Sequence, residues 1–377
     1  MADNAVIVTG ATGQVGTYIS LFLARLGVAD FIYLVCRDPR RASTVLFNTK
    51  TNALMRGHDC KVEALPLDLR DYEAAAEQLE KIKPRLIINS AALMTLYPYF
   101  PALRRRQKRM GFTPGFAHTL PKDMAVLWPL MRAVHDASPD TRVVNLAAPD
   151  TGPFILKPLG LVPTVGAGTL DSTTHGIRLA VGNKLGVPYS AIRIQMVSHH
   201  AIRRFPSSVV PFFLRIYANG EDVTRSLDHN ELIDHAVDVT GVETVSTPVD
   251  NNASITAASA VETARAILLD TGEIRHGSGV DGAPGGTPVR LTAAGAQVVL
   301  PEGLTPDEAR RINEVGMHID GLESVDENGT VTFTENERRW IREGLGLSWD
   351  RMSLEDSYDM YLELDEAYKR LNREETA

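Results

Sequence analysis

Three glycines near the amino terminus have a spacing that could bind phosphate. Gly10, Gly13 and Gly16 form a GxxGxxG pattern between an apolar run and an amphipathic segment. Such a turn needs glycine where the backbone approaches a pyrophosphate, and the first N–H groups of the next helix present the positive end of its dipole. We expect a dinucleotide site built from this turn and from a nearby strand end, with these residues: Gly10, Thr12, Gly13, Gln14, Val15, Gly16, Ser90 and Ala91.

The second expected strand covers residues 32–36, and the residues that follow it indicate which dinucleotide binds. A site for NAD usually places Asp or Glu here, to accept hydrogen bonds from the adenosine ribose. This chain has Arg37, with Arg40 close behind it, and a guanidinium can pair with a 2′-phosphate through two parallel hydrogen bonds. The sequence therefore favours NADPH over NADH, with Arg37 and Arg40 as ligands. The alternative is a solvated basic turn in which Asp38 reaches the ribose.

Strands and helices alternate through the first part of the chain, which is typical of a parallel α/β sheet. Beyond Pro149 the pattern becomes mixed, with a helix expected at 172–185 and a glycine-rich flexible connection at 276–286. We predict a Rossmann doubly wound parallel sheet followed by an α+β catalytic domain. The expected parts are a dinucleotide-binding domain at 1–148, a catalytic domain at 149–319 and a charged helical extension at 320–377.

Residues 93–122 interrupt the alternation with prolines and the basic run RRRQKR. A compact α/β unit normally has a short loop at such a point, and long loops tend to be lids or binding segments. We expect an irregular basic lid here, although a merely solvated basic loop is the alternative.

Two enzyme families begin with this kind of turn, and their proton chemistry separates them. Short-chain dehydrogenases and their extended relatives use a tyrosine activated by a lysine four residues later, and none of the ten tyrosines here has lysine at that offset. The order of VTGATGQVG, VVNLAAPD, GTLDS and IRIQMVSHHA instead resembles the lactate/malate dehydrogenase family, over roughly residues 6–315. The resemblance implies that family's two-domain fold and a hydride transfer between a nicotinamide and a carbonyl carbon.

The resemblance also implies a proton donor and its partner. The matching residues are His200, at the end of the strand in IRIQMVSHHA, and Asp171 of LDS. Histidine suits this role because its pKa lies near neutrality, and a carboxylate stabilises its charged form. His199 is the rival, since strand alternation points only one of two neighbours at the site.

The substrate side departs from the family's pattern. Thr174 stands where the family has an arginine that grips the substrate carboxylate, so an ordinary 2-oxo acid such as pyruvate or oxaloacetate is in doubt. Arg178, one helical turn later, could reach an anion instead. The expected substrate-binding residues are Arg106 and Arg109 of the lid, Thr174, Arg178 and Ser254.

Composition narrows the class of protein. The 377 residues carry a formal net charge of −8, which argues against a nucleic-acid or anionic membrane surface. The two cysteines are too few for a disulfide framework, and the amino terminus lacks the plan of a signal peptide. We expect a cytoplasmic protein without a metal and, from the resemblance, a homodimer or homotetramer.

We therefore predict an NAD(P)-dependent oxidoreductase, with NADPH favoured, that interconverts a ketone or 2-oxo acid and the corresponding alcohol. Three alternatives stay open: an imine or opine-type reductase on the same scaffold, an extended short-chain reductase or epimerase with an unusual acid, and a nucleotide-binding protein without catalysis.

Overall fold

A computed structural model describes residues 4–240 and 252–376. Its first half is a parallel sheet in the order β3-β2-β1-β4-β5-β6, so the strand order reverses between β1 and β4. The strands are β1 Ala5–Thr9, β2 Phe31–Cys36, β3 Lys61–Pro66, β4 Leu86–Asn89, β5 Arg142–Asn145 and β6 Val165–Gly166. The helices between them are α1 Gln14–Leu26, α2 Pro39–Met55, α3 Tyr72–Ile82, α4 Phe100–Met110, α5 Leu120–Ala137 and α6 Gly152–Leu156.

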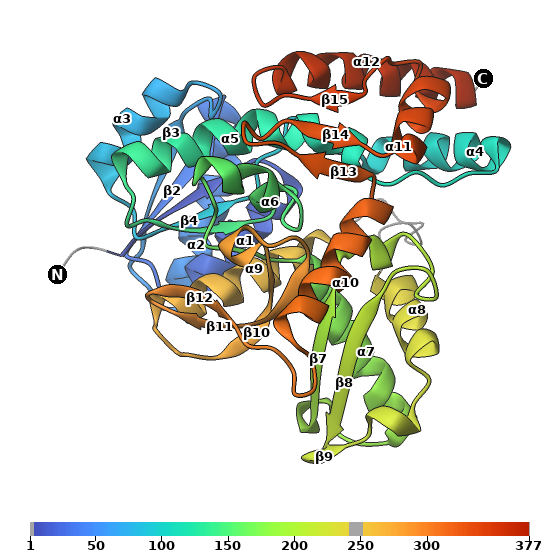
Figure 1. The fold of residues 1–377 in the computed structure, drawn as a ribbon. Coiled ribbons are helices and arrows are strands. Elements are labelled where there is room, and N and C mark those ends of the chain that lie inside the picture. The colour runs from blue at the N-terminus through green and yellow to red at the C-terminus, as the bar shows by residue number, and fades with distance from the viewer. Residues whose placement is uncertain (1–3, 241–251, 377) are drawn as a thin grey trace.

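Helices cover both faces of this parallel sheet (Figure 1). All five residues of β1 are buried, as expected for a strand covered on both sides. Val6 and Val8 pack into one core with α1 and α2, whereas Ile7 packs into the other with α3 and α5. Successive side chains of a strand point to opposite faces, so one apolar strand contributes to both cores.

The second half extends the same sheet with antiparallel strands, in the order β6-β10-β11-β7-β8-β9, and β12 pairs with β11. These strands are β7 Ile192–Ser198, β8 Phe212–Ala218, β9 Glu221–Asp222, β10 Ile274–Ser278, β11 Gly286–Thr292 and β12 Gly295–Val298. The helices are α7 Thr169–Leu185, α8 His229–Thr240, α9 Ala253–Leu268 and α10 Pro306–Ile319. Short 3-10 turns are η3 Lys157–Leu159, η4 Tyr189–Ala191, η6 Thr224–Ser226 and η7 Val280–Gly282. The predicted fold class is confirmed.

Two segments differ from the sequence-based expectation. The expected irregular lid contains the helix α4, flanked by the 3-10 turns η1 Tyr97–Tyr99 and η2 Ala117–Thr119. Pro98 and Pro101 do not break it, because they lie in the first turns of η1 and α4, where proline is tolerated. The expected flexible connection at 276–286 contains the end of β10 instead.

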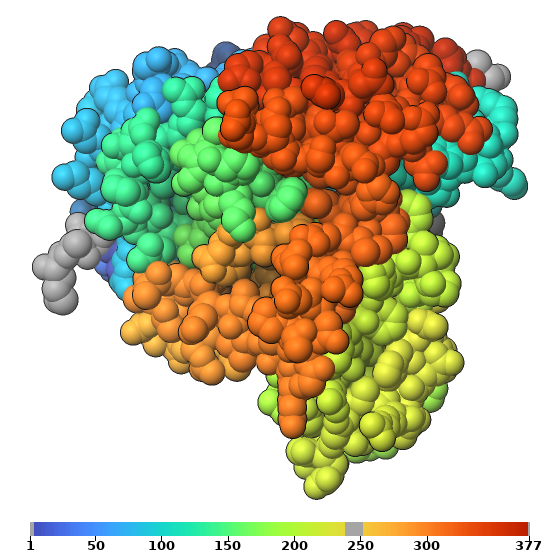
Figure 2. Space-filling model, viewed as in Figure 1, coloured from blue at the N-terminus to red at the C-terminus, as the bar shows by residue number. Residues whose placement is uncertain are grey.

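The carboxy-terminal extension, which was expected to be helical, also contains strands. It contains a small antiparallel sheet of β13 Leu322–Val325, β14 Val331–Phe333 and β15 Arg351–Met352. Its helical part comprises α11 Glu335–Arg339, the π-helical turn η8 Trp340–Gly344 and α12 Ser357–Thr376. Figure 1 shows α12 lying along α4 and α5. In Figure 2 the extension covers one end of the nucleotide-binding half and lies against the segment that contains α4.

Buried polar contacts attach the extension to the lid segment. The carboxylate of Glu337 accepts hydrogen bonds from the backbone N–H groups of Gly115 and His118, both at 2.8 Å. The ring of His118 lies 2.5 Å from the same carboxylate and 2.8 Å from the Tyr368 hydroxyl. The extension is therefore part of the folded domain. Within the described ranges, no helix has both the length and the apolar character that a membrane crossing needs.

Candidate active site

The glycine turn lies against the end of β4, as its spacing predicts. Gly10 has φ 65°, and a Cβ there would come within 2.7 Å of the Ser90 carbonyl oxygen and 2.9 Å of the Ala91 Cα. A Cβ on Gly16 would overlap the Gly10 carbonyl oxygen. Gly13 is the N-cap of α1 without a side-chain hydrogen bond, and the first turn contains no acidic residue. The start of α1 can therefore accept an anion.

Thr12 and Val15 are half-buried beside this turn, and Gln14, the first residue of α1, is exposed. Ser90 donates its hydroxyl to the Thr9 carbonyl oxygen at 2.7 Å, which ties the end of β4 to that of β1. The predicted cofactor residues of the turn and of Ser90–Ala91 thus lie at one edge of the sheet, next to the point where the strand order reverses. Such a point is the usual ligand crevice of an open α/β sheet.

Arg37 and Arg40 differ in their surroundings. Arg37 directly follows β2 and is exposed. The carboxylate of Asp38 caps α2 by accepting from the Arg40 N–H at 3.0 Å, and it lies 3.3 Å from Arg40 Nε. Asp38 is therefore directed at the helix start, and Arg37 is the basic residue at the strand end.

A buried ladder of hydrogen bonds, formed by one hydroxyl and two side-chain amides, joins three strand ends at this edge. The sequence reasoning missed it. Asn89 Oδ1 accepts from the Thr9 hydroxyl at 2.6 Å, and Asn89 Nδ2 donates to Asn145 Oδ1 at 2.8 Å. All three residues are fully buried. Buried polar groups with satisfied partners rigidify their surroundings, so the ladder fixes β1, β4 and β5 relative to one another. The sequence could have indicated this ladder, because each of the three apolar strands ends in a polar residue.

His200 lies between two buried carboxylates. It begins the 3-10 turn η5, His200–Arg203, after β7. Its Nδ1 is 3.9 Å from Asp150 Oδ2, and its Nε2 is 3.6 Å from Asp320 Oδ2. Phe116 of the lid segment stacks on the imidazole, with ring centroids 5.9 Å apart. The residue predicted to donate a proton thus lies where the nucleotide-binding half, the second domain and the extension meet.

Burial controls the charges in this cluster. Burial, with the positive charges of Arg203 and Arg204, lowers the pKa of His200 to about 3. Burial raises the pKa of Asp150 to about 7, against the effects of a hydrogen bond from Thr169 and the charge of Arg203. Burial also raises the pKa of Asp320. The imidazole is therefore neutral near pH 7, when Asp150 is half protonated.

Two polar atoms of this cluster have no hydrogen-bond partner among the described residues. They are Asp150 Oδ1 and His200 Nδ1, and both are buried. The second oxygen of Asp150 accepts from the Thr169 hydroxyl at 2.9 Å. Buried polar atoms without partners are uncommon and call for an explanation. A site that transfers a proton or binds a polar atom of a substrate would explain both atoms.

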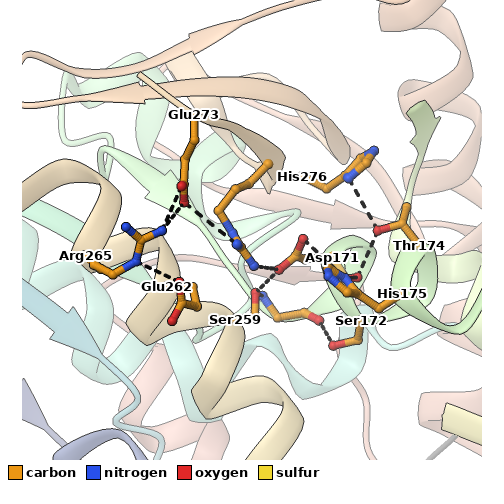
Figure 3. Close-up of polar contacts among 11 residues, drawn as sticks. Asp171, Ser172, Thr174, His175, Ser259, Glu262, Arg265, Glu273 and His276 are labelled. Atoms are coloured by element: carbon orange, nitrogen blue, oxygen red, sulfur yellow. Dashed lines mark hydrogen bonds and ion pairs between the residues drawn. The ribbon is translucent and has the colours of Figure 1, made fainter. Parts of the chain in front are cut away.

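Asp171 does not have the predicted partner. Its Oδ2 accepts from Ser259 Oγ at 2.8 Å and from Arg275 Nη2 at 2.9 Å, and its Oδ1 lies 3.8 Å from His175 Nδ1 (Figure 3). Burial alone would raise the pKa of Asp171, but Arg275 and the two nearby histidines bring it below its usual value. The expected pairing of Asp171 with His200 is thus replaced by an ion pair with Arg275, and the carboxylates beside His200 are Asp150 and Asp320.

Thr174 takes part in the same buried network (Figure 3). Its hydroxyl donates to the Asp171 carbonyl oxygen at 2.9 Å and lies 3.3 Å from His276 Nδ1. His276 Nε2 accepts from the Met196 N–H at 3.1 Å, and burial lowers the pKa of His276 to about 4. Neutral His276 therefore links α7 to β7. Thr174 serves this internal network, and nothing in its contacts presents it to a substrate.

The other predicted substrate residues are dispersed. Arg106 binds Glu374 and Glu375 at 2.6 and 2.7 Å, and Arg109 also binds Glu375. Both arginines thus attach α4 to α12, which corrects their expected role. Arg178 is half-buried on α7, and its Nε has no hydrogen-bond partner among the described residues. Ser254 is half-buried in the first turn of α9.

His199, His200 and Asp320 each offer a possible ligand atom, and these atoms lie within 4.8 Å of one another. The donor set does not fit a cation. His199 Nδ1 already accepts from the Ala201 N–H at 3.2 Å, so the proton of the neutral ring is on Nε2, the other possible ligand atom. The positive charges of Arg203 and Arg204 also act on His200. His199 is fully buried, which favours His200 as the functional member of the pair.

The buried Asp150 carboxyl gives a stability prediction. The pKa of Asp150 is about 7 in the folded protein, against an ordinary value of 3.8. Its protonated form therefore contributes to the free energy of unfolding at low pH, and this contribution is lost as pH rises through 7. Asp150→Asn keeps a neutral side chain of the same shape. We expect the variant to be more stable than the wild type at about pH 8, by roughly 2 to 4 kcal/mol, with a smaller gain at about pH 5.

Urea denaturation of both proteins at the two pH values measures this difference. Asp320 and His200 titrate in the same cluster, but both remain in the variant, so the difference between the proteins reports on Asp150. A variant that is less stable than the wild type at the higher pH would show instead that Asp150 is an ionised partner of Arg203.

Comparisons with known proteins agree with this architecture. The chain has the fold of the lactate and malate dehydrogenases, a Rossmann domain followed by a mixed α+β domain in one continuous sheet. Malate dehydrogenase from Salinibacter ruber is 20% identical, with a TM-score of 0.59 over 84% of this chain and 95% of that one. The Cryptosporidium parvum malate dehydrogenase is 18% identical, with a TM-score of 0.61 over 84% and 96% of the two chains.

A lactate dehydrogenase from Cryptosporidium parvum, solved with lactic acid and nicotinamide adenine dinucleotide, is 19% identical, with a TM-score of 0.57 over 85% and 99% of the two chains. The NAD dependent epimerase/dehydratase family matches residues 6–98. No curated protein sequence matches the chain. The family match thus covers the nucleotide-binding half alone, and the structural likeness continues through the second domain.

Proposed function

We propose that this protein is an NADPH-dependent oxidoreductase that interconverts a carbonyl compound and its alcohol. The observation that carries the proposal is the glycine turn, packed against the end of β4, in a fold shared with malate and lactate dehydrogenases. The pyrophosphate binds at the start of α1. The nicotinamide exchanges hydride with the substrate carbon, and Arg37 binds the 2′-phosphate.

His200 is the proposed proton-transfer residue. Its neutral state at pH 7 suits acceptance of the hydroxyl proton as an alcohol is oxidised, and the reverse reaction needs its protonated form. The family's aspartate position is occupied by Asp171, which is bound to Arg275. We therefore assign the positioning of the imidazole to Asp150, the carboxylate near Nδ1.

The proposed substrate is a ketone or 2-oxo acid, or the corresponding alcohol, other than pyruvate or oxaloacetate. Thr174 cannot form the salt bridge that a 2-oxo acid makes with arginine. The positive charge of Arg203 lowers the pKa of both His200 and Asp150. Burial is the main cause of the low pKa of His200, and an anionic substrate group beside Arg203 would offset the smaller contribution of that arginine's charge.

The cofactor assignment is tested by Arg37→Asp, with intrinsic fluorescence to follow titrations with NADPH and NADH. Loss of charge-assisted hydrogen bonds should weaken NADPH binding about tenfold or more, and a carboxylate at this strand end should improve NADH binding. Arg40 was also expected to bind the cofactor, but its guanidinium is directed at Asp38 and is 93% exposed, so we propose Arg37 alone as the ligand and use Arg40→Asp as the matched control. If the wild type binds neither nucleotide at about millimolar concentration, the proposed oxidoreductase function fails.

A homodimer is the proposed assembly, in the cytoplasm. Helix α2 presents Phe47, Leu54 and Met55 on one face, with exposed fractions of 66, 68 and 73%. Their i, i+7, i+8 spacing makes one apolar stripe, and large exposed apolar patches usually mark an interaction site. Sedimentation of a Leu54→Asp variant beside the wild type would separate a dimer from a monomer.

A further inference from the structure

The first turns of α12 reach the edge of the sheet at which the strands β1 to β4 end. The Tyr361 hydroxyl donates to the Leu93 carbonyl oxygen at 3.4 Å, and Leu93 lies four residues after β4. The Arg70 guanidinium stands over the Tyr358 ring, 4.2 Å from its centroid, and Arg70 lies four residues after β3. Two tyrosines of the extension thus contact the loops that follow β3 and β4.

Arg37 lies on the same side. Burial raises the pKa of Tyr361, and the positive charge of Arg37 opposes that shift. The same positive charge contributes to the low pKa of Asp68, whose carboxylate binds Arg70 at 2.6 Å. The strands β2 and β3 pair in parallel up to Cys36 and Pro66, so Arg37 and the loop after β3 begin side by side, and the charge of Arg37 also acts on Tyr361.

A dinucleotide that crosses this edge places its adenosine half near the end of β2, because the residue at that strand end contacts the adenosine ribose. We propose that the carboxy-terminal extension forms part of the cofactor site, with Tyr358 and Tyr361 as the outer wall of its adenosine end. This inference rests on the proposed function. It adds a ligand-contacting role for a segment that follows the two domains.

The wall is held in place from both sides. Arg70 is fixed beneath Tyr358 by its contacts with Asp68. The rings of Tyr358 and Tyr361 are 6.0 Å apart, and the far end of α12 is attached to α4 through Arg106 and Glu375. Residues whose positions are fixed in advance bind a ligand with a smaller entropic loss.

The chemistry of these side chains fits an adenosine 2′-phosphate. A tyrosine ring can cover the face of the adenine, because every base has an aromatic face on which such a ring can stack. Arg37 supplies the charge for the phosphate. The nicotinamide half crosses to the other side of the strand-order reversal, towards β4 and β5, so the tyrosines should affect the adenosine half alone.

The test is a set of binding titrations with Tyr361→Ala and Tyr358→Ala. The ligands are NADPH, adenosine 2′,5′-bisphosphate as the adenosine half, and reduced nicotinamide mononucleotide as the other half. We expect each variant to bind NADPH and the bisphosphate about tenfold more weakly, with no change for the mononucleotide. Tyr217→Ala is the matched control, since Tyr217 lies on β8 under Arg193.

Hydrogen exchange of the wild-type protein gives a second measurement that needs no substitution. Saturating NADPH should slow exchange of the amides at 357–364, and the mononucleotide should leave them unchanged. Equal affinities of wild type and both variants for NADPH and the bisphosphate, with no protection of α12, would overturn the inference while leaving the cofactor assignment intact. A wild type that binds none of the ligands would overturn both.

Discussion

A Gly16→Ala variant should lose dinucleotide binding. The added Cβ would overlap the Gly10 carbonyl oxygen and come within 2.8 Å of the Ala11 Cα. Both are backbone atoms of the turn itself, so neither can move aside as the end of a flexible side chain would. The start of α1 would have to separate from the turn that holds the pyrophosphate. We expect NADPH binding to weaken about a hundredfold or more, which corresponds to about 2.7 kcal/mol.

Fluorescence titration with NADPH measures this loss, and Gly57→Ala is the control. Gly57 has φ 76° and no heavy atom within 4 Å of an added Cβ, so alanine there should reduce stability by about 1 kcal/mol through backbone strain without changing binding. Gly57 follows α2 and precedes β3, at the opposite edge of the sheet from the glycine turn. A Gly16→Ala protein that binds NADPH as tightly as the control would show that the turn does not hold a pyrophosphate.

The sequence could predict the nucleotide-binding half because its signals are local. The five residues of β1 are all apolar or small and all buried, and the glycines that follow are required by contacts within a few residues or with one neighbouring strand. Short apolar runs with glycine punctuation have few other interpretations in an alternating chain.

The lid and the extension could not be predicted, because each depends on the other. Helix α4 is strongly basic, and its charge is compensated by Glu374 and Glu375 at the far end of the chain. Read alone, the basic residues and prolines suggest an irregular loop. Propensity is a weak guide where tertiary contacts decide, and the partner in this case is more than 260 residues away.

The partner of His200 could not be predicted for a related reason. Asp171 is the aspartate that the resemblance to the lactate/malate dehydrogenases selects, but its carboxylate is bound by Arg275, a residue that the sequence placed next to a flexible glycine-rich connection. A buried carboxylate needs a compensating charge, and the sequence does not show which of several arginines supplies it. Asp150 and Asp320 approach His200 from the end of β5 and from the end of α10, and only the folded chain brings them together.

His200→Asn should abolish turnover while leaving cofactor binding intact. General acid–base catalysis contributes about 10² to 10⁴ in rate, and asparagine keeps a polar group in the cluster without an ionisable ring. Turnover is measured by the absorbance of the nicotinamide. Ketones and 2-oxo acids are tested for the oxidation of NADPH, and the corresponding alcohols for the reduction of NADP. NADPH titration of the same variant checks that the nucleotide site is unchanged, which separates an enzyme from a protein that only binds the nucleotide.

Two carboxamide variants identify the carboxylate that acts through His200. Asp150→Asn should shift the pH profile of the rate, because it removes the group near Nδ1 whose pKa is about 7. Asp171→Asn should reduce stability, since it leaves Arg275 without its charged partner, and should keep the wild-type pH profile. If instead Asp171→Asn alone changes the profile, the ring of His200 turns toward Asp171 when substrate binds, and the resting cluster with Asp150 and Asp320 is a state that the reaction leaves.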